Sequence, residues 1–211
     1  MRYLFIDTST HDLTIAISSS DEILSISTSN NTNEHSKYAL TELKSTFDEA
    51  GLKPDEIDKV MVINGPGSFT GVRIGVTIAK TYAWALKKEI IPVSSLLAFA
   101  LGYDGYDYYV SAIDARRDCV YAAVYNNNYD NVLEEQYISI DKLNDFIATL
   151  KGNVIVIGDI NINGYNNVPI KIDVLKIVQH FKDGQPVSPH SLNPHYLKRV
   201  EAEEKLMGVI E

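Results

Sequence analysis

The first sixty-five residues contain four short segments whose apolar spacing predicts β-strands. Their side chains are apolar at alternate positions or in a short continuous run, as in strands buried on one or both faces. These predicted strands cover residues 3–7, 13–18, 22–28 and 59–63. A polar stretch interrupts the pattern after the third strand.

Two helices are predicted in the same part of the chain. Residues 35–50 place apolar side chains at helical spacing, and Gly51 stands where such a helix would stop. A longer helix, from about residue 70 to residue 88, follows the fourth strand after a glycine-rich loop.

The order of predicted elements then recurs, which is the main indication of the fold. In both halves a strand ends in an aspartate, Asp7 or Asp114, and turns into the next strand. The second copy continues with strands and helices at residues 119–124, 132–138, 140–150, 154–159 and 173–181. The repeat predicts an α/β fold of the actin/hexokinase-like type, in which two βββαβα lobes face each other.

The two lobes are expected at residues 1–103 and 104–211, with a boundary near residues 101–107. The second lobe is shortened and degenerate, because residues 160–164 stand where the first copy has a glycine–proline loop. The C-terminal stretch from residue 193 to residue 206 is expected to pack back across the first lobe.

Composition narrows the class of protein. The chain has 211 residues, of which 45% are hydrophobic, enough to bury a core in one domain or two small lobes. Its single cysteine, Cys119, argues against a disulfide framework and is more typical of a small buried side chain than of a nucleophile. No signal peptide or membrane-spanning segment is visible, so we expect a cytoplasmic protein.

The charge bears on the partners. A net charge of −9 opposes direct binding to a phosphate backbone. If the protein serves a nucleic acid, we therefore expect it to do so through a partner.

The segment Asp7, Thr8 and Ser9 is the first candidate for chemistry. It lies at a strand end, where an actin-like fold holds a carboxylate and hydroxyl groups near a metal–phosphate group. Short polar side chains also stabilise ordinary turns by bonding to nearby amides. Both interpretations stay open.

Gly65, Gly67 and Ser68 belong to the second candidate segment, a loop between a strand and a helix start. Free amides and the helix dipole at such a place attract anions. The loop is neither a Walker loop nor a dinucleotide fingerprint, and Ser68 is also suited to cap the helix. We predict a vestigial nucleotide or phosphate cleft here, with a purely structural turn as the alternative.

The long helix carries a stripe of small residues. Positions four apart share one helix face, and the stripe with its apolar neighbours consists of Gly71, Val72, Gly75, Val76, Ala79 and Ala83. Two glycines lower helix propensity by about 1 kcal/mol each, so a close backbone contact is expected on this face. The contact is either with the protein's own sheet or with another subunit. We predict a subunit interface, with the helix at residues 35–50 beside it.

Six motifs, taken in order, resemble the TsaB (YeaZ) family from about residue 2 to residue 205. They are residues 6–9, 35–36, 65–75, 93–96, 113–117 and 194–197. The glycine–proline segment is highly specific and the others are moderately so.

The resemblance implies a shortened actin-like fold and a scaffold role without a cofactor or metal. Proteins of this family pair with the related TsaD, which holds a metal and transfers threonylcarbamoyl to the tRNA adenosine beside the anticodon. The ATPase TsaE joins the larger complex. The resemblance thus implies TsaD-like and TsaE-like partners, tRNA contact only through the complex, and no membrane, and it leaves open whether the isolated chain is a homodimer.

One departure from TsaD fits this division of labour. TsaD-like chains carry a His-x-x-x-His metal pair after the strand that follows the long helix, and the matching positions here are Ser95 and Phe99. Neither residue replaces imidazole as an iron or zinc ligand. A peptidase is discounted because no nucleophile–base pair or zinc spacing is present.

The alternative from another class is a free-standing actin-fold ATPase or small-molecule kinase. Asp114 would then supply the carboxylate, but the second lobe lacks the second phosphate loop that this chemistry needs.

Overall fold

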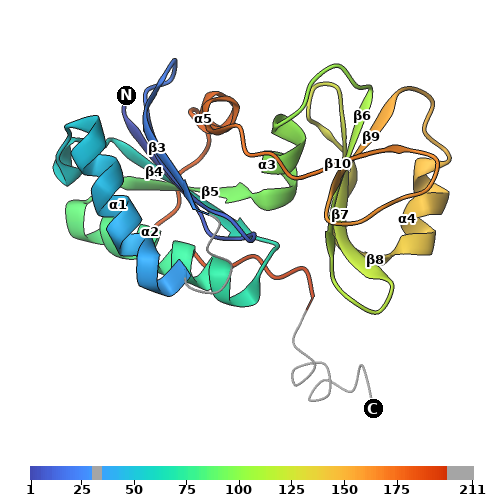
Figure 1. Cartoon of the computed structure of the whole chain (residues 1–211), viewed down its shortest axis with the longest axis horizontal. Helices are drawn as coiled ribbons and strands as arrows, with labels where there is room; N and C mark the ends of the chain where they lie inside the picture. The colour runs from blue at the N-terminus through green and yellow to red at the C-terminus, as the bar shows by residue number, and fades with distance from the viewer. Residues whose placement is uncertain (30–34, 199–211) are drawn as a thin grey trace, which may run out of the picture. The chain divides into compact units, whose positions relative to one another are not determined.

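The computed structural model describes residues 1–29 and 35–198. The chain forms two compact units, each built on a five-stranded sheet (Figure 1). The first unit contains Met1–Asp104 and Ile170–Pro194, and the second contains Gly105–Pro169 and the residues from His195 onward.

The sheet of the first unit has the strand order β3-β2-β1-β4-β5. Its strands are β1 (Tyr3–Asp7), β2 (Leu13–Ser18), β3 (Ile23–Ser29), β4 (Lys59–Gly65) and β5 (Glu89–Ser94). The central strand β1 runs antiparallel to β2 and parallel to β4. All five residues of β1 are buried, so this strand is the centre of the unit.

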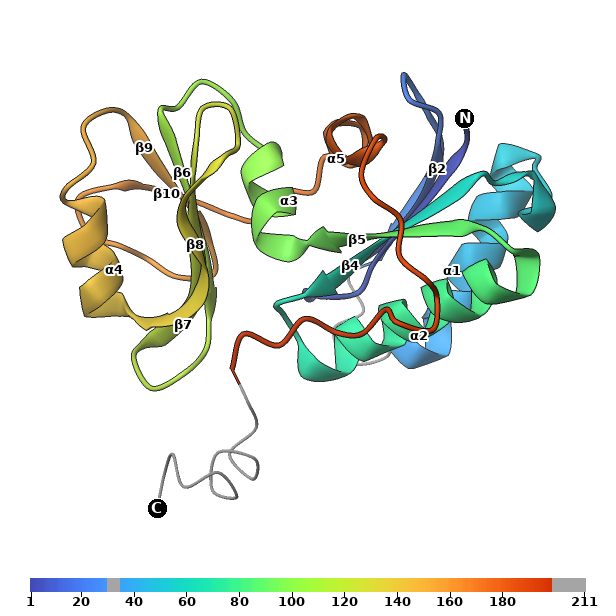
Figure 2. The ribbon, with the colours of Figure 1, turned by 180° about the vertical axis from the view of Figure 1, so that it is seen from behind.

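Four α-helices complete the described part of the first unit. They are α1 (His35–Ala50), α2 (Phe69–Leu86), α3 (Ser95–Leu101) and α5 (Val174–Phe181), with a 3-10 turn η1 (Pro54–Glu56) before β4. Helices α1 and α2 share one apolar core with β1, β2 and β4, whose members include Phe47, Val76, Ile6 and Ile15. Figures 1 and 2 show α1 and α2 on one face of the sheet and α5 on the other.

The ends of α2 follow from local chemistry. The Ser68 side chain caps the first turn by accepting a hydrogen bond from the Gly71 amide at 3.2 Å. At the other end Lys87 adopts a left-handed conformation (φ 53°), and its amide donates to the carbonyls of Ala83 and Trp84.

The second unit repeats the plan of the first. Its strands are β6 (Tyr108–Asp114), β7 (Cys119–Asn126), β8 (Asn131–Ser139), β9 (Val154–Gly158) and β10 (Asn166–Val168), and the helix within its described residues is α4 (Ile140–Ile147). The order β8-β7-β6-β9-β10 matches β3-β2-β1-β4-β5, and β6 is antiparallel to β7 and parallel to β9, as β1 is to β2 and β4. The predicted duplicated fold is confirmed.

The structure departs from the sequence-based expectation in the second half. The helix predicted at residues 173–181 forms, but it packs against β2 and α3 of the first unit. The segment after it also returns to that unit, where the Val187 amide donates to the Ile90 carbonyl at 2.9 Å and the Lys80 ammonium donates to the Leu192 carbonyl at 2.7 Å. Residues 170–194 were expected in the second lobe, so this expectation is wrong for them.

The expected return of residues 193–206 is only partly visible. The Asn64 side chain donates to the Asn193 carbonyl at 3.3 Å in the first unit, whereas residues from 195 group with the second. The part from residue 199 lies outside the described residues. Within the described part, no helix has the length and apolar character needed to cross a membrane.

Candidate functional site

Asp7 ends β1 and holds the turn that follows it. Its carboxylate atom Oδ1 accepts hydrogen bonds from the Ser9 amide at 2.8 Å and from the Ser9 hydroxyl at 2.7 Å. The Ser9 carbonyl in turn accepts from the Ser68 amide at 2.8 Å. The carboxylate therefore anchors the glycine–proline loop through Ser9, and both residues are almost fully buried.

The hydroxyl of Thr8 is inserted against the backbone of α2. It donates to the Gly71 carbonyl at 2.6 Å and accepts from the Gly75 amide at 3.0 Å. In a regular helix the carbonyl of residue i pairs with the amide of residue i+4. The Thr8 hydroxyl thus lies between the carbonyl and the amide of one such pair, Gly71 and Gly75, and connects α2 to the central strand.

Gly67, Gly71 and Gly75 lie so close to Thr8 and Ser9 that they leave no room for a β-carbon. A β-carbon at Gly67 would lie 2.5 Å from the Ser9 carbonyl oxygen, and one at Gly71 would lie 2.0 Å from the Thr8 carbonyl oxygen. A β-carbon at Gly75 would lie 2.4 Å from the Thr8 hydroxyl. These distances are well inside van der Waals contact, so glycine is required for close packing rather than for flexibility.

The prediction that the small-residue stripe faces another subunit is wrong. Gly71, Val72, Gly75, Val76, Ala79 and Ala83 are the buried residues of α2. They face β1 and β4 of their own unit, as the distances to Thr8 and the shared core show. The four-residue spacing of the small side chains correctly indicated which face of α2 makes a close contact, but the backbone that approaches this face belongs to the protein's own sheet.

The predicted cleft residues come together in space, within the first unit. Ser9 contacts the loop at Gly67 and Ser68, Thr8 contacts the first turns of α2 at Gly71 and Gly75, and Gly65 pairs with Ser94 at the neighbouring strand end. The Ser68 amide donates its hydrogen bond to the Ser9 carbonyl, so it is not available to a phosphate. These contacts favour the structural-turn interpretation of the loop over a phosphate cradle.

The second unit reproduces the aspartate turn. The Arg116 amide donates to Asp114 Oδ1 at 2.8 Å, as the Ser9 amide does to Asp7. Here, however, the carboxylate is exposed, and the Asp114 amide donates to Asp159 at 2.8 Å. The strand that corresponds to β4 leads into β10 instead of a glycine loop and a long helix, so the described part of this lobe has no counterpart of α2.

The positions that would hold a metal pair are part of the core. Ser95 and Phe99 are both fully buried, and the Ser95 hydroxyl donates to the Pro66 carbonyl. Among residues 1–29 and 35–198, no group of three or more His, Cys, Asp or Glu side chains is arranged to hold a metal ion.

Cys119 is half-buried at the start of β7. It hydrogen-bonds with Tyr137, and this bond is the main cause that raises the pKa of the Tyr137 hydroxyl above its ordinary value. The phenol therefore stays protonated at neutral pH and provides no base for the thiol.

The outer faces of α1 and α2 form an open groove of about 400 Å³. It is lined by Ser36, Leu40, Phe69, Thr70, Arg73, Ile74, Thr77 and Ile78. Leu40 is 64% exposed and Phe69 is 48% exposed, and the Arg73 guanidinium lies 3.7 Å from the centre of the Phe69 ring. Sequence reasoning missed this surface because it followed the small residues, whereas the apolar side chains opposite the core mark the groove.

Replacing Asp7 tests whether its role is structural. Asp7→Ala removes both hydrogen bonds to Ser9, so we expect a loss of about 2 kcal/mol in the free energy of unfolding. Asp7→Asn keeps an acceptor oxygen and should lose less. Urea denaturation measures both. At equal concentrations of folded protein, we expect partner-dependent activity to change little; a large loss of activity in a well-folded variant would instead give the carboxylate a chemical role.

Comparison with known proteins places these features in a family. The family model described as "TsaD: tRNA N6-adenosine threonylcarbamoyltransferase" matches residues 22–166, more than half of the chain. The TsaB protein of Bacillus subtilis, named for tRNA threonylcarbamoyladenosine biosynthesis, is 39% identical over 154 residues, which cover 72% of this chain and 66% of that protein. The TsaB protein of Escherichia coli is 28% identical over 99% of both chains.

A solved structure shares the fold. YeaZ from Pseudomonas aeruginosa superposes with a TM-score of 0.77 over 92% of this chain and 100% of that one, at 21% identity. The similarity in structure therefore extends over both units.

Proposed function

The chain belongs to the TsaB family, and from this premise we propose that it is the non-catalytic dimerisation subunit of a complex that transfers threonylcarbamoyl to the tRNA adenosine next to the anticodon. A TsaD-like protein is the catalytic partner, and a TsaE-like ATPase joins the larger complex. The tRNA is reached through the complex, in keeping with the net charge of −9.

The state of Ser95 and Phe99 is the observation that carries the non-catalytic role. Both side chains are fully buried inside the first unit, and the Ser95 hydroxyl donates to the Pro66 carbonyl. Serine has no imidazole nitrogen, its hydroxyl points to a backbone carbonyl inside the core, and the phenyl ring of Phe99 has no lone pair, so the two positions do not supply a histidine pair for iron or zinc. The chain thus shares its fold with a threonylcarbamoyl transferase, but the side chains at positions 95 and 99 stabilise the core instead of binding a metal.

The groove between α1 and α2 is the proposed subunit interface. Exposed Leu40 and Phe69 supply apolar anchors, and Arg73 supplies a planar cation beside them. Interfaces place such side chains at the centre of a patch that buries about 800 Å² on each partner. The same surface serves for a homodimer when the catalytic partner is absent.

Reconstitution from purified components tests the proposal. The reaction contains threonylcarbamoyl adenylate, unmodified tRNA, TsaE and the TsaD protein of the same organism, with or without this chain. We expect modified adenosine only when TsaD and this chain are both present, and no stoichiometric iron or zinc in the isolated chain. Steady ATP hydrolysis by the isolated chain would support the free-standing ATPase or kinase instead.

A further inference from the structure

A pocket of about 210 Å³ lies on the face of the first sheet that α1 and α2 leave uncovered. The side chains of Ser25 and Ser27 point toward α1, since they donate to its residues Glu49 and Glu42. Because neighbouring strand residues face opposite sides, Ile26 and Thr28 point away from α1. Both of them line the pocket.

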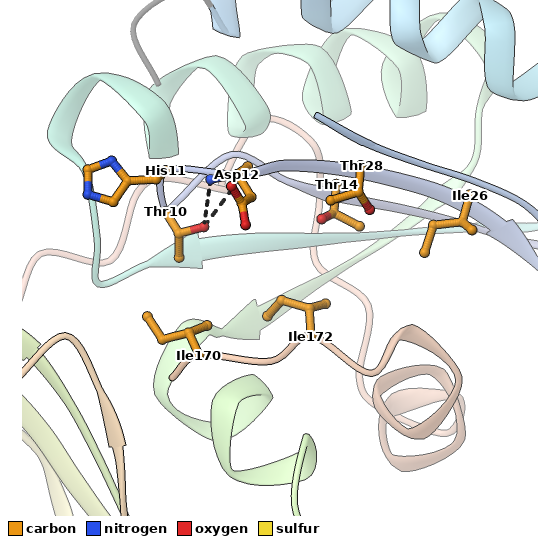
Figure 3. A pocket seen from close by; sticks show the side chains of 8 residues that line it. All are labelled: Thr10, His11, Asp12, Thr14, Ile26, Thr28, Ile170 and Ile172. Atoms are coloured by element: carbon orange, nitrogen blue, oxygen red, sulfur yellow. Dashed lines mark hydrogen bonds between the residues drawn. The ribbon is translucent and has the colours of Figure 1, made fainter. Parts of the chain in front are cut away.

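The pocket has a polar side and an apolar side (Figure 3). Thr10, Asp12, Thr14 and Thr28 belong to the β1–β2 turn and to strands β2 and β3. Ile170 and Ile172 approach from the segment before α5, opposite these residues, and His11 lines the end of the pocket beside Thr10.

Three side chains on the polar side have unused hydrogen-bonding capacity. Thr10 bonds to the backbone of Asp12 at 3.3 Å. Within residues 1–29 and 35–198, by contrast, the side chains of Asp12, Thr14 and Thr28 have no hydrogen bond or ion pair. Thr14 is only 5% exposed, so the pocket is the route by which its hydroxyl meets a ligand.

The lining selects the charge of the ligand. It contains one carboxylate, Asp12, one imidazole, His11, and no lysine or arginine, so the one permanent charge of the lining is negative and repels an anion. A partly buried carboxylate without a partner favours a cation or a hydrogen-bond donor. The isoleucines opposite favour an aliphatic body, because covering them removes apolar surface from water.

We propose that this pocket binds a primary ammonium group carried on a short alkyl chain. An ammonium group has three donors and no acceptor, which matches one carboxylate and two hydroxyls. The alkyl chain lies along Ile170 and Ile172, as lysine stems lie along apolar surfaces. The volume equals that of roughly seven water molecules, which suits a chain of about four to six carbons. The pocket is independent of the proposed scaffold role.

The ammonium group has two sources, a free aliphatic amine or a lysine side chain of another protein. Titration by two-dimensional NMR of the labelled full chain separates them, with n-butylammonium and Nα-acetyl-lysine N-methylamide as probes and n-butanol as the neutral match. We expect weak binding of both amines, with dissociation constants in roughly the millimolar range. Shifts should be confined to residues 10–14, 26–28 and 170–172. Tighter binding of the lysine derivative identifies a protein lysine as the source, and equal or weaker binding identifies a free amine.

Two matched variants test the role of the carboxylate. Asp12→Asn keeps the shape and removes the charge, so we expect at least a tenfold loss of affinity for both amines. Asp21→Asn removes the same charge from an exposed turn of the same unit and should leave affinity unchanged. Circular dichroism checks the fold, and shortening the amine from butyl to methyl tests the isoleucine wall in the unmodified protein. Equal binding of butanol and butylammonium, or full affinity in a folded Asp12→Asn variant, would overturn the proposal.

Discussion

Adding one methyl group at Gly71 is expected to lower the free energy of unfolding by about 3 kcal/mol. The new β-carbon would lie 2.0 Å from the Thr8 carbonyl oxygen, so α2 would have to move away from the central strand. Helix propensity alone gives the opposite sign, since alanine is favoured over glycine by about 1 kcal/mol in a helix interior. Urea denaturation of Gly71→Ala therefore separates the two effects by direction.

Gly75 provides the matched comparison, because its clash is with a side chain. A β-carbon there would meet the Thr8 hydroxyl at 2.4 Å. Gly75→Ala is expected to cost about 2 kcal/mol, and Thr8→Ala about 1–2 kcal/mol through its two lost hydrogen bonds. In the double variant the clash is gone, so the combined loss should be smaller than the sum by at least about 1 kcal/mol.

The same cycle at Gly71 should show no rescue. Alanine at position 8 keeps the carbonyl oxygen that opposes Gly71, so the two losses should add. If Thr8→Ala reduced the stability loss of Gly71→Ala as much as that of Gly75→Ala, the clash at Gly71 would not be with the Thr8 carbonyl, and the close approach of the β1 backbone to α2 would be incorrect.

A charged side chain in the groove between α1 and α2 is expected to abolish subunit binding. Leu40→Arg places a cation where an apolar anchor would be buried against the partner, and such an unpaired buried charge is strongly unfavourable. We expect at least roughly a 100-fold loss of affinity for TsaD, about 2.7 kcal/mol, together with loss of any homodimer. Because Leu40 is 64% exposed, the monomer should stay folded.

Light scattering after size-exclusion chromatography and calorimetric titration with TsaD measure this effect. Leu24→Arg is the matched control, since Leu24 is also exposed but, being next to Ser25, lies on the sheet face away from α1. Gly75→Arg does not test the interface, because Gly75 faces Thr8 in the core. Wild-type affinity in a folded Leu40→Arg variant would place the interface elsewhere.

The duplicated topology was predictable because period-two and helical patterns repeat in the same order in both halves. The position of α5 was not, since its apolar face suits either sheet, and its packing against β2 and α3 together with the return of the chain to Ile90 assigns it to the first unit. The stripe from Gly71 to Ala83 shows a related limit. Spacing shows which face of α2 makes a close contact, but the identity of the other backbone is a tertiary property.

The candidate site was predictable as a set of segments but not in its function. From the sequence, only the resemblance to an actin-like fold predicts that residues 7–9 lie near the loop around Gly67. The structure shows the contact directly. That the Ser9 carbonyl takes up the Ser68 amide could not be read from residue types, because glycine, serine and threonine suit phosphate binding and tight packing equally.

The Thr8 bridge makes the amide hydrogen of Gly75 a reporter on two elements at once. This hydrogen is bonded to a side chain of the central strand, so its exchange with solvent deuterium requires β1 and α2 to separate. Fraying of the helix from either end leaves that bond intact. Since β1 lies between β2 and β4, separation exposes the core of the whole first unit. The exchange rate of this one amide therefore measures global opening of the unit, while its helical neighbours on the outer face report local motion.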